Sequence, residues 1–163
     1  MILIILRIVI ASILRVRQGA ALEVVTRGTR MSDAIHKEIE LAASPKRVYD
    51  ALLDAKQFAA FSGAPAEIEP GAGGAFSCFG GIITGRHVEL VPAKRIVQAW
   101  RVRIWPEGAY SIVSFELTPG GAGTRLSMTH VGFPSEMRAH LNGEMADGGW
   151  NRQYLEPLRK YLS

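Results

Sequence analysis

Cysteine is nearly absent from this chain, and so is any long hydrophobic run free of charge. Its 163 residues include one cysteine, Cys78, which excludes an internal disulfide framework and is typical of a reducing compartment. The apolar run at residues 2–14 is interrupted by Arg7 and is shorter than the roughly 20 residues that a membrane-spanning helix needs. We therefore expect no stable membrane span, a cytoplasmic location, and a buried Cys78 that behaves as a small hydrophobic residue.

Motifs that mark metal sites and catalytic nucleophiles are also missing. The sequence has no HExxH and no GxSxG, and no GK[ST] follows the glycine-rich run at residues 71–74. The four histidines lack the spacing of metal ligands. His87-Val88-Glu89 resembles half of a zinc deaminase motif, but the Pro-Cys-x-x-Cys half is absent, so alternation along a surface strand is the preferred explanation. We expect no metal, no cofactor and no catalytic residue.

An excess of positive charge exists only at the N-terminus. The net charge is +4, and residues 1–30 contain five arginines against Glu23. From residue 31 onward, 14 basic residues oppose 14 acidic ones. A neutral domain has little attraction for phosphate backbones, so nucleic acid is excluded as the main partner.

Residues 1–30 differ in composition from the rest and form a predicted leader, followed by one domain at 31–163. The preferred interpretation is that Met31-Ser32-Asp33 is the native start and that the leader results from the choice of start site. A signal or membrane anchor and a transit peptide are the alternatives, since the segment is apolar, arginine-rich and poor in acidic residues.

Hydrophobic periodicity predicts an α+β domain in which strands precede a C-terminal helix. Ser44-Pro45 is a strong helix start, because serine caps an orphan N–H and proline lacks one; this helix is expected to reach about residue 61. The linking turns are too short for parallel crossovers, so neighbouring strands are expected to be antiparallel. A short helical turn is expected at 135–141. The predicted strands are residues 35–41, 66–69, 75–79, 82–91, 95–104, 109–118 and 124–131.

The stretch at residues 147–162 is the element around which the domain is organised. At about 100° per residue its apolar side chains fall on one arc of a helix, and its charged side chains fall on the other side. Pro157 is expected to kink this helix by removing the bond to the Gln153 carbonyl. We predict a curved antiparallel sheet that covers the apolar arc, which comprises Trp150, Tyr154, Leu155, Leu158, Tyr161 and Leu162.

A cavity between this sheet and helix is the predicted ligand site, because small-molecule sites are mostly apolar with few polar groups. Gln98 and His130 are the polar side chains on the inward faces. Taken alone, His130 is more often a histidine satisfied by backbone or water, and tryptophans are more often core residues than cofactor contacts. If the core is filled instead, the Trp105-Pro106 hairpin becomes the predicted contact patch. The predicted lining is Phe61, Phe76, Gln98, Trp100, Phe115, Met128, His130 and Trp150.

Several motifs resemble one known family. These are Ser44-Pro45, Val91-Pro92 with Trp100-Arg101, the run Trp105-Pro106-Glu107-Gly108, and Gly149-Trp150 with Tyr154-Leu155. Together they resemble the C-terminal domain of the activator of heat-shock-protein-ninety ATPase, within the helix-grip superfamily of birch-pollen-allergen-like and START-like proteins. The resemblance covers nearly all of residues 33–162.

The resemblance implies an incomplete antiparallel barrel around the C-terminal helix. It implies a non-enzymatic, stress-related domain that binds a small hydrophobic molecule or a chaperone protein. The eukaryotic co-chaperone carries a separate, larger domain that engages the chaperone, so binding rather than ATPase activation is the expectation here. A cyclase or aromatase-type enzyme that uses His130 as acid or base is the alternative. A homodimer is left open.

Overall fold

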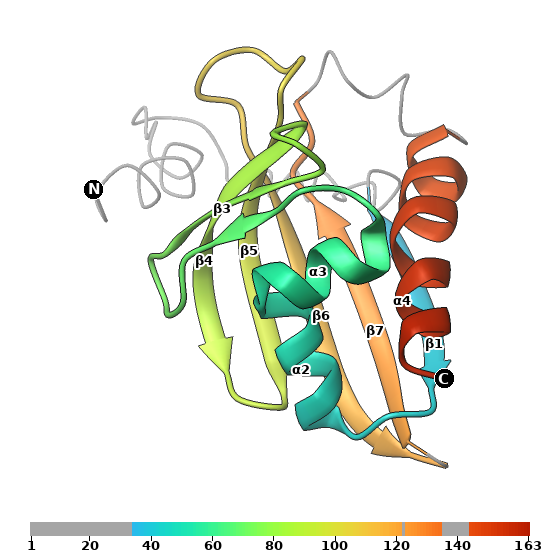
Figure 1. Cartoon of the computed structure of the whole chain (residues 1–163). Helices are drawn as coiled ribbons and strands as arrows, with labels where there is room; N and C mark the ends of the chain where they lie inside the picture. The colour runs from blue at the N-terminus through green and yellow to red at the C-terminus, as the bar shows by residue number, and fades with distance from the viewer. Residues whose placement is uncertain (1–33, 122, 135–143) are drawn as a thin grey trace, which may run out of the picture.

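The computed structural model describes residues 34–121, 123–134 and 144–163, which form a bent seven-stranded sheet around a C-terminal helix (Figure 1). All neighbouring strands are antiparallel, in the order β1-β7-β6-β5-β4-β3-β2. The α+β helix-grip architecture predicted from the sequence is confirmed. The strands are β1 (Ile35–Leu41), β2 (Glu67–Ile68), β3 (Ala75–Cys78), β4 (Ile83–Val91), β5 (Arg95–Val102), β6 (Ser111–Gly120) and β7 (Gly123–Val131). The leader at residues 1–30 and the turn expected at 135–141 lie outside the described residues.

Period-2 alternation assigns one face of the sheet to the core, as strand geometry requires. On β6, Val113, Phe115 and Leu117 are buried, while the residues between them are half-buried or exposed. On β7 the same alternation buries Leu126, Met128 and His130. These inward faces are the ones predicted from the sequence.

The helical segment after β1 differs from the prediction. It is two helices, α2 (Pro45–Leu53) and α3 (Ala55–Ser62), rather than one helix to about residue 61. Asp54 has extended backbone angles and ends α2, and its side chain accepts a hydrogen bond from the Gln57 N–H to begin α3. The short side chain of Asp54 hydrogen-bonds a nearby backbone N–H and so favours a helix cap over a position inside a helix. The break therefore occurs at this residue. The predicted start is confirmed, because Ser44 caps α2 with Pro45 in its first turn.

The C-terminal helical path has two kinds of winding. Residues Glu144–Leu155 form a π-helix, η3, and Glu156–Tyr161 form an α-helix, α4. Pro157 lies in the first turn of α4, where a missing N–H is tolerated, and the winding changes just before it. The prediction of a uniform 100° per residue is therefore wrong for η3. The side chains of the predicted apolar arc nevertheless reach the core.

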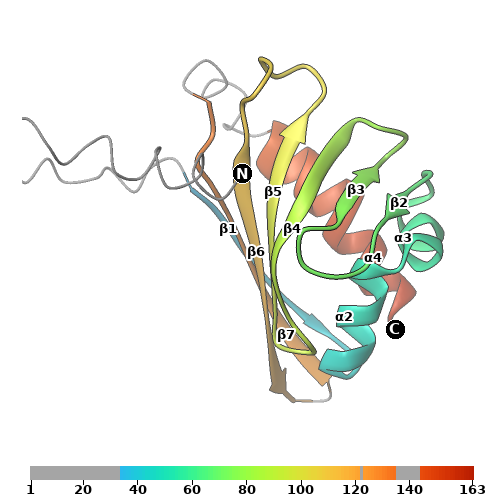
Figure 2. The ribbon, with the colours of Figure 1, turned by 90° about the vertical axis from the view of Figure 1, so that its left-hand side faces the viewer.

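All described helices lie on one side of the sheet, and the opposite side carries none of them (Figure 2). The core lies between the sheet and these helices. Trp150, Tyr154, Leu155 and Leu158 come from the C-terminal path and are nearly inaccessible. The apolar arc therefore faces the concave side of the sheet, as predicted.

Candidate functional site

Four of the eight residues of the predicted lining meet, together with Tyr154, in one cluster of aromatic rings between the sheet and η3. The rings of Trp100 and Trp150 stack with centroids 5.0 Å apart, and those of Phe115 and Tyr154 stack at 5.8 Å. Phe76 adjoins Trp100 at 6.2 Å, and Tyr154 adjoins Trp150 at 5.0 Å. These separations are those of rings in direct contact. The five rings are therefore in contact, and we call them the interior cluster.

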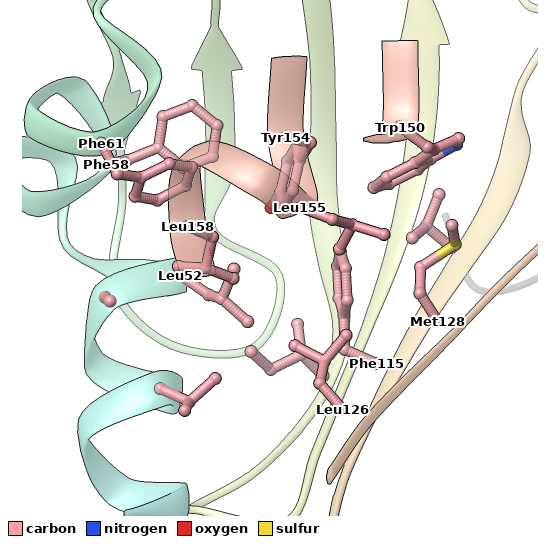
Figure 3. Packing of buried hydrophobic residues seen from close by; sticks show 14 of the residues in the cluster. Leu52, Phe58, Phe61, Phe115, Leu126, Met128, Trp150, Tyr154, Leu155 and Leu158 are labelled. Carbon is pink, nitrogen blue, oxygen red and sulfur yellow. The ribbon is translucent and has the colours of Figure 1, made fainter. Parts of the chain in front are cut away.

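Figure 3 shows how the helix and the sheet contribute to this packing: Trp150 and Tyr154 project from the helix toward Phe115 and Met128 on the sheet. Met128 is fully buried in the same core. Phe61 lies apart from the tryptophans, on α3, where its ring adjoins Phe58 at 4.7 Å and Tyr154 at 5.8 Å. It also borders an open hollow between α3 and α4 that is lined by Pro157 and Tyr161 among others.

His130 lies at the end of β7 with both ring nitrogens hydrogen-bonded. The indole N–H of Trp150 donates to its Nδ1 at 3.2 Å, and its Nε2 lies 2.7 Å from the hydroxyl of Ser111. Because an indole can only donate, Nδ1 is the acceptor and the proton of the neutral ring is on Nε2. Nε2–H then donates to Ser111, whose hydroxyl in turn donates to the Trp100 carbonyl at 3.4 Å.

This chain of hydrogen bonds defines the chemical state of His130. The side chain is 1% exposed, and burial lowers its pKa from 6.5 to about 3. A ring that is neutral at physiological pH and engaged at both nitrogens has no lone pair or proton to exchange with a substrate. The geometry thus favours the satisfied core histidine over the acid or base of a cyclase-type enzyme.

Gln98 belongs to a second buried chain, which also contains a residue that sequence reasoning assigned to the surface. The Trp100 indole donates to Gln98 Oε1 at 2.9 Å, so the amide nitrogen of Gln98 faces His87 Nδ1 at 3.2 Å. His87 is 2% exposed and stacks on Phe76 with centroids 5.4 Å apart. The surface-strand interpretation of His87 is therefore wrong.

A β-bulge between His87 and Glu89 explains the error. Ile83 and Leu90 both pack against the core, yet they have opposite parity along β4. Both can face inward only if one extra residue lies between them, and that residue is Val88, which is 45% exposed. This change of parity is the sequence signal that places His87 on the inner face.

The Nε2 atom of His87 is a buried polar atom without a hydrogen-bond partner in the described part of the chain. Because Nδ1 accepts from Gln98, the neutral ring carries its proton on Nε2. Burial lowers the pKa of His87, and an interaction with the Glu69 backbone opposes that shift. The Nε2–H of His87 is therefore an unpartnered donor among the described residues, on a ring that stacks on Phe76.

Cys78 is 5% exposed, and burial raises the pKa of its thiol to about 12. A protonated thiol is a poor nucleophile and a poor metal ligand, so Cys78 is the small hydrophobic residue predicted from the sequence. Within residues 34–121, 123–134 and 144–163, no three His, Cys, Asp or Glu side chains gather as metal ligands would. No helix in these ranges has the length and hydrophobicity to cross a membrane.

In the hairpin after β5, Trp105 is buried and is not part of an exposed contact patch as predicted. Trp105 is 4% exposed, its ring adjoins Phe133 at 6.3 Å, and its carbonyl accepts from Arg101 at 2.8 Å. Trp105 is thus a core residue of the hairpin. Its neighbours Ile104 and Tyr110 are 73% and 52% exposed.

The bent sheet closed on a C-terminal helix, with aromatic side chains between them, places this protein in the helix-grip class of folds. A family model described as "Activator of Hsp90 ATPase homolog 1-like protein" matches residues 42–163, and the chain belongs to this family.

Curated relatives agree with this assignment. The human "Activator of 90 kDa heat shock protein ATPase homolog 1" is 32% identical over 117 residues, which are 72% of this chain and 33% of the human protein. The homologue from Dictyostelium discoideum is 30% identical over 125 residues, covering 76% of this chain and 31% of that protein. This chain therefore aligns with about a third of the length of these relatives.

Solved structures share the fold. A Plasmodium falciparum protein described as an HSP90 activator superposes with a TM-score of 0.72 at 29% identity, covering 80% of this chain and 96% of that one. The protein CV1439 from Chromobacterium violaceum gives a TM-score of 0.65 at 29% identity, covering 81% of this chain and 98% of that one.

Proposed function

We propose that this domain is a non-enzymatic binding module for a chaperone of the Hsp90 class, acting in the cytoplasm. The observation that supports the proposal is the contact among rings in the interior: Trp100 stacks on Trp150, and Phe115 adjoins Trp150 and stacks on Tyr154. Rings in direct contact leave no room between them for a ligand, and this suits a protein partner bound at the outer surface better than an enclosed small molecule. Family membership supplies the class of partner.

Direct binding tests this proposal. The purified domain, immobilised, is expected to retain purified Hsp90-class chaperone from the same genome, and titration calorimetry is expected to give a saturable isotherm. The effect on chaperone ATP hydrolysis is measured in parallel, because binding and stimulation are separable. Absence of retention and of a calorimetric signal would refute the proposal.

A second candidate function is binding of a small apolar molecule, and the unpartnered Nε2–H of His87 is the observation that favours it. An unpartnered donor on a ring that stacks on Phe76 suits a ligand with one acceptor oxygen and an apolar body. Such a ligand would have to displace side chains that are now in contact. The surface-binding proposal needs no such rearrangement and is the better supported of the two.

A further inference from the structure

One face of the sheet carries no described helices (Figure 2). The side chains on its two halves differ, and this difference points to a partner surface. The half toward the β4–β5 and β6–β7 turns is ion-paired. Arg95 lies 3.0 Å from Glu116, and Arg125 lies 2.8 Å from Glu40. Both of these arginines lie beside a carboxylate, so their charges are balanced within the domain.

The other half, toward the β5–β6 hairpin, is apolar. Strand register places Ala99, Ile112 and Val131 side by side in one row across β5, β6 and β7. Ile112 and Val131 are 38% and 37% exposed, and Tyr110 is the next outward residue before Ile112. Exposed β-branched and aromatic side chains in adjacent positions are typical of interaction surfaces.

Unpaired arginines border this apolar row. Arg86 is the register partner of Ala99, and its guanidinium donates to the Gly73 carbonyl. Arg101 donates to the Trp105 carbonyl, and Arg103 is exposed. Within the described ranges none of the three forms an ion pair, and the single carboxylate of the hairpin, Glu107, is likewise unpaired.

We infer that this half of the sheet is the surface that docks the chaperone, and that it takes an acidic segment with exposed apolar side chains. The inference rests on the proposed function, since it assigns that partner a place and a chemistry. Carboxylates of the partner would complement the unpaired arginines, and its apolar side chains would cover Ile112 and Val131. We call this area the arginine-bordered face: Arg86, Ala99, Arg101, Arg103, Ile104, Tyr110, Ile112 and Val131.

Charge reversal tests the electrostatic part. Arg103→Glu is expected to weaken chaperone binding at least about tenfold at low salt, with a difference that shrinks as salt screens the charges. Arg125→Glu is the matched control, because it reverses an exposed arginine in the ion-paired half of the same face. Equal loss in both variants, or no loss in Arg103→Glu, would overturn the inference while the proposed function stands.

Replacement of apolar side chains by aspartate tests the apolar part of the proposed surface. Ile112→Asp is expected to abolish retention, whereas Val88→Asp, at a similarly exposed position on β4, is expected to retain wild-type binding. Ile104→Asp lies in the hairpin turn and serves where Ile112→Asp fails to fold. Sedimentation of each variant is part of the test: a wild-type dimer that Ile112→Asp dissociates would assign the face to a second copy and overturn the inference. No retention by wild type refutes the proposed function itself.

Discussion

At the scale of single residues, the two inner histidines show how burial and hydrogen bonding define chemistry. His130 accepts from an indole and donates to a hydroxyl, so its full hydrogen-bonding capacity as a neutral ring is used. His87 accepts from an amide and leaves one N–H unused. The same residue type is therefore a structural connector on β7 and a potential recognition group on β4.

The depressed pKa of His130 makes stability depend on pH. The unfolded ring binds a proton near pH 6.5, and the folded ring does so only near about 3. As pH falls through this window the unfolded state binds more protons, so the free energy of unfolding is expected to fall by about 1.4 kcal/mol per pH unit from this group. Urea denaturation across the window measures the slope.

His130→Gln supplies the comparison, because glutamine does not titrate. The variant is expected to be less stable near neutrality and to show a shallower decline toward acid. Burial also lowers the pKa of His87, so part of the slope should persist in His130→Gln. An unchanged slope in that variant would mean that His130 is not held neutral in the folded protein.

Trp105 was predicted to contact a partner, but its burial makes it important for the stability of the fold. It is 4% exposed and packs against Phe133, so Trp105→Ala is expected to cost about 3–5 kcal/mol. Its exposed neighbour is the matched control: Ile104→Ser is expected to stay within about 0.5 kcal/mol of wild type. Thermal and urea unfolding measure both, and a small effect of Trp105→Ala would contradict the assigned burial.

At the scale of elements, Asp54 joins two short helices through one residue. Its backbone N–H bonds to the Asp50 carbonyl to close α2, and its side chain caps the Gln57 N–H to open α3. Asp54→Ala removes the cap and is expected to cost about 1 kcal/mol of stability. Asp54→Asn keeps an acceptor oxygen and is expected to restore most of that loss.

A control within α2 separates capping from simple removal of a carboxylate. Asp50 makes an exposed ion pair with Lys46, so Asp50→Ala is expected to cost no more than about 0.5 kcal/mol. Equal effects of Asp54→Ala and Asp50→Ala would argue that the junction is not held by the cap.

At the scale of the whole molecule, alternation along the strands predicted which face of each strand is buried, and the short turns predicted antiparallel neighbours. The incomplete barrel around the C-terminal helix was implied by the family resemblance. The errors of the prediction lie where the periodic pattern is interrupted. The bulge at Val88 reverses the inward–outward alternation along β4, so His87 was assigned to the surface. The capping carboxylate of Asp54 divides a helical segment whose apolar spacing is continuous. The π winding of η3 has no simple periodic signal. Whether a predicted lining encloses space or fills it depends on side-chain packing, which a residue list does not encode.

The last prediction concerns the contacts of Phe115 in the interior. Phe115 lies under both Trp150 and Tyr154 and is 1% exposed, so Phe115→Ala is expected to cost about 3–5 kcal/mol and to leave a hole between sheet and helix. Apolar holes of this kind stay dry and bind benzene. Benzene should therefore raise the melting temperature of Phe115→Ala and leave wild type unchanged. A wild-type protein that binds benzene or an environment-sensitive dye saturably, and loses this binding in His87→Phe, would favour the small-molecule function over the surface-binding one.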